Sequence, residues 1–420
     1  MDNINVLIDA YNLQISQGTG IRTYTNNLIK ALNQGGVDIS LLYGLYNQSD
    51  FTRVLESSVN QSKFANTLNR LQTIWRLINP SPLALPVENI STQMLTDFDH
   101  AGENVKFFNA SKCYQTSFIK YKLFKKNSHI KLNQKIDIWH RTYPIMPILI
   151  DGCACNIVTI HDLIPLKLPN STSYNTKWFY QAVGQTIQES QGIITDSECS
   201  KRDILELYDV DPSKVYVIYP AISNHKFKPT PDLLDYYLQK YQLQQRKYFL
   251  SVGMIEPRKN LSRLIDAYLR IDTDFPLVIV GKKGPLWQQE LERINDHSKI
   301  KLLEYIDKID LSYLYSGAYC LIFPSIYEGF GLPLLEAMGF GCPVIASHAS
   351  CLPEVCGDAA IYINPYDVSS ICSQIELLLG DINLREKLII AGTKRVEFFS
   401  MENYSQALTK TYRSILELVS

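Results

Sequence analysis

Short apolar runs rich in β-branched residues alternate along this chain with stretches of helical periodicity, and no other feature constrains the fold as much. Five runs lie in the first half: INVLIDA (4–10), IDIWH (136–140), CNIVTIHD (155–162), GIITDS (192–197) and VYVIYP (215–220). Five more follow: KYFLSVG (247–253), PLVIVG (276–281), IKLLEY (300–305), CLIFPS (320–325) and PVIAS (343–347). Such runs separated by helices predict parallel α/β units, and two sets predict two doubly wound sheets.

The length agrees with two domains, because a chain of 420 residues exceeds the size at which one hydrophobic core stops growing. We place the first domain at 1–222, with an insertion at about 50–135 where the alternation fails. A polar, proline-containing stretch after VYVIYP marks a hinge near 222–232, and the second domain covers 223–400. We expect the last helix, 401–420, to cross back toward the first domain.

Composition excludes several classes of protein. The 41 basic residues nearly cancel the 42 acidic ones, which indicates no nucleic-acid partner. The nine cysteines are scattered, and the closest pair is Cys153 and Cys155, so neither a disulfide framework nor a zinc site is expected. There is no basic leader and no apolar run of about 18 residues. We expect a cytoplasmic protein, and leave open a peripheral attachment to the inner membrane face.

A basic segment is the reason for leaving that attachment open. Eight lysines and no acidic residue lie between Glu103 and Asp137. Four of these lysines alternate with aromatic residues, in the order Phe118, Lys120, Tyr121, Lys122, Phe124, Lys125, Lys126. Such a surface can meet anionic lipid headgroups. The alternative is a solvated insertion without a partner.

The most informative stretch is PSIYEGFGLPLLEAMGFGCPVIAS (324–347), which follows the run CLIF. Gly329 and Gly331 permit unusual backbone angles before the helical run LPLLEAMGF. A strand, a glycine loop and a helix N-terminus together present free amides and a positive dipole end to an anion. Glu328 and Glu336 flank this unit, eight residues apart, so both carboxylates can lie in one pocket with sugar hydroxyls.

The run EGFGLPLLEA resembles the E-x7-E signature of the retaining GT-B glycosyltransferases of family 4, also called group 1 transferases. The resemblance covers most of the chain and is weakest across 45–135. It implies two Rossmann-like domains facing a cleft. It also implies that Glu336 holds the ribose of a nucleotide and Glu328 lies beside the donor sugar. The family's amides at the sugar and phosphate correspond to Phe330, Gly331 and Leu332.

A second motif, SVGMIEPRKNLSRLIDAY (251–268), places Arg258 and Lys259 directly before a helix, where the dipole disfavours cations. A bound diphosphate would remove this conflict, and simple solvent exposure is the alternative. The run is similar to the family's G-R-x4-K diphosphate clamp and to its G-x-x-E-P-R-K-N version. Lys259 matches the lysine, but Met254 stands where the arginine is usual. We therefore expect Arg258 to supply the second cation.

Strand ends in the first domain provide further candidates, because open α/β sheets bind ligands there. Gly20 and Tyr24 match the family's glycine loop and tyrosine facing the donor phosphates, and a ligand-free turn is the alternative. The resemblance implies that His161 contacts the donor sugar. His140 and Arg141 follow IDIW, and we place them, with Tyr24, on the acceptor side.

The resemblance implies transfer of a hexosyl group from a nucleotide-diphosphate sugar, with backbone near Ile306 holding the base. GDP-mannose is the favoured donor, a glycan or lipid-linked oligosaccharide the favoured acceptor, and no metal or other cofactor is expected. A rhamnosyl or glucosyl donor remains open. So do an epimerase, a phosphorylase and an inactive sugar-nucleotide-binding scaffold. A metal-dependent transferase is disfavoured because no Asp-x-Asp pair follows an apolar strand; the pairs are Asp97/Asp99, Asp209/Asp211 and Asp272/Asp274.

Overall fold

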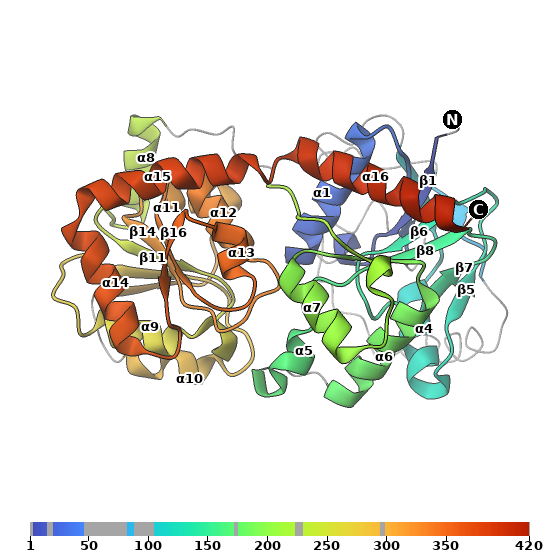
Figure 1. Ribbon diagram of the computed structural model, residues 1–420, viewed down its shortest axis with the longest axis horizontal. Helices are drawn as coiled ribbons and strands as arrows, with labels where there is room; N and C mark the ends of the chain where they lie inside the picture. Colours follow the sequence, from blue (N-terminus) through green and yellow to red (C-terminus); the bar gives the residue numbers. More distant parts are fainter. Residues whose placement is uncertain are drawn as a thin grey trace, which may run out of the picture.

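The computed structural model describes residues 3–14, 20–45, 82–87, 105–171, 175–222, 230–294 and 299–419. Within these ranges the chain forms two α/β lobes, each built on a largely parallel sheet (Figure 1). The insertion expected at about 50–135 is described only in part, and its helical stretch NTLNRLQTIWRLI (66–78) lies outside the described residues. The same holds for most of the hinge expected near 222–232.

The N-terminal lobe contains an eight-stranded sheet of order β10-β9-β8-β6-β1-β2-β4-β3, in which only β3 and β4 pair antiparallel. Its strands are β1 (Asn5–Asp9), β2 (Asp38–Tyr43), β3 (Leu85–Pro86), β4 (Val105–Asn109), β6 (Ile138–Arg141), β8 (Cys155–Thr159), β9 (Gly192–Thr195) and β10 (Val215–Val217). A separate parallel pair is β5 (Ser128–Ile130) and β7 (Ile148–Ile150). Its helices are α1 (Gly20–Gln34), α4 (Cys113–Phe124), α5 (Ile164–Lys167), α6 (Thr176–Glu189) and α7 (Glu198–Leu207).

The C-terminal lobe contains a six-stranded parallel sheet of order β13-β12-β11-β14-β15-β16. Its strands are β11 (Phe249–Val252), β12 (Leu277–Val280), β13 (Ile300–Leu303), β14 (Cys320–Phe323), β15 (Val344–Ser347) and β16 (Ala360–Ile363). Its helices are α8 (Pro231–Lys240), α9 (Leu261–Tyr268), α10 (Trp287–Leu291), α11 (Lys308–Gly317), α12 (Leu332–Gly339), α13 (Leu352–Cys356), α14 (Val368–Gly380) and α15 (Ile382–Glu397). All ten apolar runs of the sequence are strands, as predicted.

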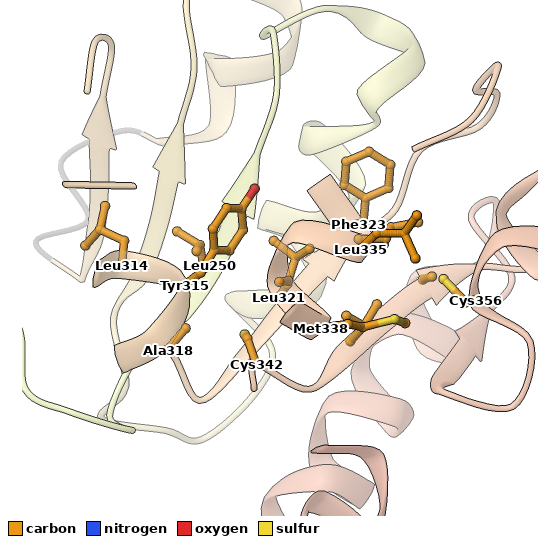
Figure 2. Packing of buried hydrophobic residues seen from close by; sticks show 14 of the residues in the cluster. Leu250, Leu314, Tyr315, Ala318, Leu321, Phe323, Leu335, Met338, Cys342 and Cys356 are labelled. Carbon is orange, nitrogen blue, oxygen red and sulfur yellow. The ribbon is translucent and has the colours of Figure 1, made fainter. Parts of the chain in front are cut away.

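Both faces of the C-terminal sheet are covered, which is the reason its strands read as continuous apolar runs. On one face, side chains of β11 and β14 pack with α11, α12 and α13 in a single buried cluster. Figure 2 shows part of this cluster, with Tyr315 of α11, Phe323 of β14 and Leu335 of α12. The opposite face packs against α9 and α14. The helix α12 that follows the glycine loop is therefore anchored on a rigid core.

The last helix, α16 (Met401–Val419), packs on the N-terminal lobe. In Figure 1, α15 and α16 run along one edge of the molecule from the C-terminal to the N-terminal lobe. Tyr404, Leu408 and Ile415 of α16 are buried in the same cluster as α1. The amide of Ile222 donates to the carbonyl of Phe399 (3.1 Å), so the two crossings of the chain between the lobes lie side by side.

Each sheet reverses its strand order next to its first strand, and ligands of open α/β sheets bind at such a switch point. In the C-terminal lobe the reversal lies at β11, which has β12 on one side and β14 on the other. The loops after β11 and β14 carry both sequence motifs. In the N-terminal lobe the reversal lies at β1, between β2 and β6. The fold therefore places the predicted site residues on the two ligand-binding edges.

Candidate active site

The loops after β11 and β14 bring the two motifs of the C-terminal lobe into contact. Arg258 and Lys259 belong to a short 3-10 turn before α9. Arg258 Nη1 donates to Glu328 Oε2 and Lys259 Nζ donates to Glu328 Oε1, both at 2.6 Å. Arg258 Nε also pairs with Glu256 Oε1 at 2.7 Å. The two cations expected at a diphosphate and the carboxylate expected at a sugar thus form one cluster.

The charges of this cluster are balanced and largely buried. Burial alone would raise the pKa of Glu328, but Arg258 and Lys259 outweigh it and lower that pKa to about 2. Burial lowers the pKa of Lys259, and the Glu328 carboxylate opposes this change. For Arg258 the carboxylates of Glu328 and Glu256 outweigh burial, so its pKa is raised. The positive end of the helix dipole disfavours Arg258 and Lys259, but two carboxylates stabilise both cations here.

The loop between Glu328 and α12 presents amides rather than carbonyls. Cys351 Sγ contacts the carbonyl oxygens of Glu328 and Phe330, at 3.2 and 3.1 Å. Gly331 caps α12 with φ of 103°, a region that favours glycine, and a Cβ there would meet Leu352 and Leu334. Within the described part of the chain, the amides of Phe330, Gly331 and Leu332 donate no hydrogen bond. A helix N-terminus with unsatisfied amides favours a phosphate.

A cavity of about 290 Å³ lies between the lobes beside α12. Three helices line the cavity. The residues are Thr23, Asn26, Asn27 and Lys30 of α1, Lys308, Leu311, Ser312 and Tyr315 of α11, and Leu332 and Glu336 of α12 with its C-cap Phe340. Glu336 Oε2 accepts a hydrogen bond from the Tyr315 hydroxyl (3.1 Å), and burial raises the pKa of Glu336. Ile306 is half-buried in the loop just before α11, and exposed Gly20 is the first residue of α1.

His161 lies where the two lobes touch. A Cβ added at Gly329 would sit 2.6 Å from the carbonyl oxygen of His161, so only glycine permits this approach. His161 Nδ1 pairs with Asp196 Oδ2 at 2.7 Å, and Nε2 lies 3.2 Å from the carbonyl oxygen of Thr142. Burial alone would lower the pKa of His161, but Asp196 outweighs it and the pKa is raised. Both ring nitrogens are therefore engaged within the N-terminal lobe.

The residues expected on the acceptor side are buried instead. His140 and Arg141 are 0% exposed and Tyr24 is 3% exposed. His140 bonds to Tyr412 of α16 and, at 2.7 Å, to Thr159 Oγ1. Burial lowers the pKa of His140 to about 3, so its ring is neutral.

Arg141 pairs with Glu189 at 3.2 Å, and the Tyr24 hydroxyl bonds to Thr159 at 2.9 Å. The prediction that His140, Arg141 and Tyr24 face an acceptor is therefore wrong for this arrangement. Helices packed over the strand end enclose all three side chains. The Tyr24 ring does approach the site, because it lies edge-on to His161 with centroids 4.5 Å apart.

Sequence reasoning missed four residues: Asp162, Ser197 and Glu354 at the contact between the lobes, and Asp196, the partner of His161. A Cβ at Gly329 would also lie 2.9 Å from Asp162 Cβ. Ser197 Oγ donates to the Gly329 carbonyl (2.8 Å). The stretches TDSECS and LPEVC contain three of these residues, but no pattern in them indicates that they meet in the fold.

Comparison with known proteins shows the family of this chain. The family model described as "Glycosyl transferases group 1" matches residues 237–395. The O-antigen chain mannosyltransferase B of Escherichia coli is 33% identical over 266 residues, which cover 61% of this chain and 70% of that protein. The chain belongs to the group 1 glycosyltransferases. The predicted family is thereby confirmed.

Two further comparisons concern other parts of the prediction. The serotype-specific mannosyltransferase WbdA of Escherichia coli is 30% identical over 287 residues, 63% of this chain and 33% of that protein. The solved structure of a sucrose-phosphate synthase from Thermosynechococcus elongatus matches this glycosyltransferase with a TM-score of 0.68 at 16% identity. The match covers 99% of this chain and 100% of the synthase chain. The GT-B fold is confirmed. Among the described residues, no helix combines the length and apolarity that crossing a membrane requires.

Proposed function

We propose that this glycosyltransferase moves a mannosyl group from GDP-mannose to a glycan or a lipid-linked oligosaccharide during synthesis of a cell-surface polysaccharide. The observation that carries the proposal is the joining of Arg258, Lys259 and Glu328 beside the free amides of α12. The choice of mannose follows the names of the two Escherichia coli relatives, both mannosyltransferases. The anomeric configuration is retained, and no metal ion takes part.

Charge development explains why these groups belong together. Breaking the bond between the anomeric carbon and the diphosphate creates positive charge on the sugar and negative charge on the leaving phosphate. Arg258, Lys259 and the amides of Phe330 and Gly331 stabilise the leaving group. When the diphosphate pairs with the two cations, Glu328 loses its partners and its carboxylate faces the sugar. The departing phosphate oxygen accepts the proton of the acceptor hydroxyl, so no separate base is needed.

The nucleoside occupies the cavity between α1, α11 and α12. Glu336 has one hydrogen bond from Tyr315 and can accept others from vicinal ribose hydroxyls. Backbone near Ile306 lies just before α11 and can contact the base. Lys30 and Lys308 line the same cavity from opposite lobes, so nucleotide binding would bring the lobes together.

The basic surface on α4 supports attachment to an anionic membrane. Leu123 and Phe124 are 63% and 58% exposed, and Lys122, Lys125 and Lys126 beside them are exposed too. Apolar side chains flanked by lysines match the chemistry of a lipid interface. The pattern differs from the one predicted, because Phe118 is half-buried and Tyr121 is buried among core residues. Lys120 is also half-buried.

Vesicle sedimentation tests this surface. Changing Lys120, Lys122, Lys125 and Lys126 to glutamate should abolish salt-sensitive binding to vesicles containing phosphatidylglycerol. The control changes four exposed lysines away from α4, with the same net charge difference: Lys177, Lys387, Lys394 and Lys410. Equal loss in both variants would mean that net charge alone drives binding. If the wild-type protein did not bind these vesicles at low salt, membrane attachment through α4 would be refuted.

A screen of nucleotide sugars tests the transfer reaction. Release of GDP from GDP-mannose should depend on a glycan acceptor, and proton NMR of the product should show the α-configuration of the donor. EDTA should leave the rate unchanged, because the fixed cations do the work of a metal. Turnover that disappears with EDTA and returns with manganese would refute metal independence. A faster reaction with a rhamnosyl or glucosyl donor would refute the choice of mannose.

A further inference from the structure

A carboxylate of the C-terminal lobe caps a helix of the N-terminal lobe. Glu354 lies on α13, and α7 begins at Glu198. Glu354 Oε1 accepts a hydrogen bond from the Glu198 amide (2.7 Å), and Oε2 accepts one from the Cys199 amide (3.2 Å). The Tyr219 hydroxyl donates to Oε1 as well (2.9 Å). One side chain thus satisfies the first two amides of a helix that belongs to the other lobe.

This contact is physically favourable in three respects. The first amides of a helix have no partner within the helix, so an external acceptor is required. The positive end of the helix dipole favours a carboxylate. Charged hydrogen bonds of this kind are shorter and stronger than neutral ones. Because Glu354 is half-buried, solvent weakens the interaction without removing it.

The same helix end also contacts the catalytic loop. Ser197, the N-cap of α7, donates from Oγ to the carbonyl oxygen of Gly329 (2.8 Å). Gly329 directly follows Glu328 in the chain. On the other side, Cys351 at the start of α13 contacts the Glu328 carbonyl (3.2 Å). The α7 N-terminus therefore binds α13 and the Glu328 loop together, as one unit of the C-terminal lobe.

We propose that Glu354 is a positioning residue, which clamps α7 and thereby fixes the Glu328 loop against His161 during sugar transfer. The contact itself is independent of the reaction, but its consequence rests on the proposed transferase function. Because Glu354 acts between lobes, its loss should open the interlobe contact and leave each sheet folded. The nucleotide cavity residues of α11 and α12 remain in place, so binding of GDP should change little.

Glu354→Gln is the sharpest test, because the shape stays and one acceptor oxygen becomes an NH₂ donor facing a backbone amide. Hydrogen–deuterium exchange of a peptide covering residues 196–203 reports on the two amides without any substrate. Exchange should rise about tenfold, the scale of one charged, partly solvated hydrogen-bond pair. Glu354→Asp keeps the charge and should give an intermediate rise. Glu386→Gln, which changes an exposed carboxylate of α15, should give none. Unchanged exchange in Glu354→Gln would overturn the clamp.

Kinetics separate a positioning role from a merely structural one. Glu354→Gln should lower kcat of mannosyl transfer about tenfold and leave the Kd of GDP within about twofold, with partial rescue by aspartate. Faster exchange with unchanged kcat would overturn the positioning role and leave the transferase function standing. If the wild-type chain transferred no sugar from any nucleotide donor, the proposed function would fail. In that case the hydrogen–deuterium exchange measurements would still test whether Glu354 clamps α7.

Discussion

Replacing Glu328 with glutamine should separate donor binding from turnover. In the structure this carboxylate pairs with both Arg258 and Lys259, the cations that a diphosphate would use. The pKa of Glu328 falls from 4.5 to about 2, which corresponds to about 3 kcal/mol of interaction with its surroundings. A diphosphate must replace this interaction. Glutamine would remove this competition, and would also remove the negative charge that we propose supports the sugar cation.

The magnitudes follow from that figure. The affinity for GDP should rise, with an upper limit of about 100-fold if all 3 kcal/mol were recovered. We expect about tenfold, because Lys259 without its carboxylate partner is more easily deprotonated in its buried position. Turnover should fall about 100- to 1,000-fold, the range for loss of one charge-stabilising group in an active site. The unfolding free energy should also fall, by up to about 3 kcal/mol at neutral pH.

Titration calorimetry with GDP and single-turnover transfer from GDP-mannose measure the two effects separately. Glu256→Gln is the matched control, since Glu256 is a buried carboxylate paired with the same arginine. It should lower turnover less than about tenfold, because Glu256 is not part of the sugar-facing loop. Weaker GDP binding together with unchanged turnover in Glu328→Gln would refute the reasoning. Equal loss of turnover in both variants would show that Glu328 only aligns Arg258.

Three other predictions concern Lys259, the pH dependence of Glu328 and the buried ring of His140. Lys259→Ala should weaken GDP binding and lower kcat/KM about 100-fold or more, as calorimetry and initial rates would show; full activity would contradict its clamp role. Since the folded-state pKa of Glu328 is depressed, its contribution to stability is complete above pH 4.5 and is lost as pH falls toward 2. Urea unfolding midpoints should therefore fall more steeply in that window for the wild type than for Glu328→Gln. The pKa of His140 is lowered from 6.5 to about 3, so its stabilising effect is present above pH 6.5 and declines toward pH 3. His140→Asn should flatten the pH dependence of unfolding between those values, and an unchanged slope would show that His140 is accessible to protons in the native state.

The sequence predicted the strands that read as apolar runs, whether they are buried throughout, as β12 and β14 are, or only in part, as β13 is. It did not reveal β2 or β16. In β2 the polar residues Asp38 and Ser40 alternate with apolar ones at the start of the strand, so DISLLY does not read as a continuous apolar run. β16 is an edge strand with alternating burial, in which only Ile361 and Ile363 are buried. The pair β5 and β7 has three residues in each strand, too few for a periodic signal.

The site was predictable where its residues lie in loops at the carboxyl ends of neighbouring strands, the edge at which open α/β sheets bind ligands. Arg258, Lys259 and Glu328 belong to the loops after neighbouring strands β11 and β14, so the sheet itself brings them together. The same rule failed at His140, because Tyr412 of α16, 272 residues later in the sequence, covers the end of β6. Whether α16 covers this strand end depends on the path of the chain between the lobes, and the sequence around His140 does not indicate that path.

The proposed exchange of counter-ions at Glu328 would link recognition of the donor to activation of the site. In the structure, each charge of the cluster Arg258, Lys259, Glu256 and Glu328 has an opposite partner, which stabilises a largely buried site. A monophosphate or a sugar alone cannot both replace Glu328 at the cations and occupy the cavity beside Glu336. Under the proposed mechanism a nucleotide-diphosphate sugar would do both, and would place its anomeric carbon beside the carboxylate that it displaces. The group that would stabilise the transition state would then become available only when the leaving group is already held, and this would tie catalysis to the correct substrate.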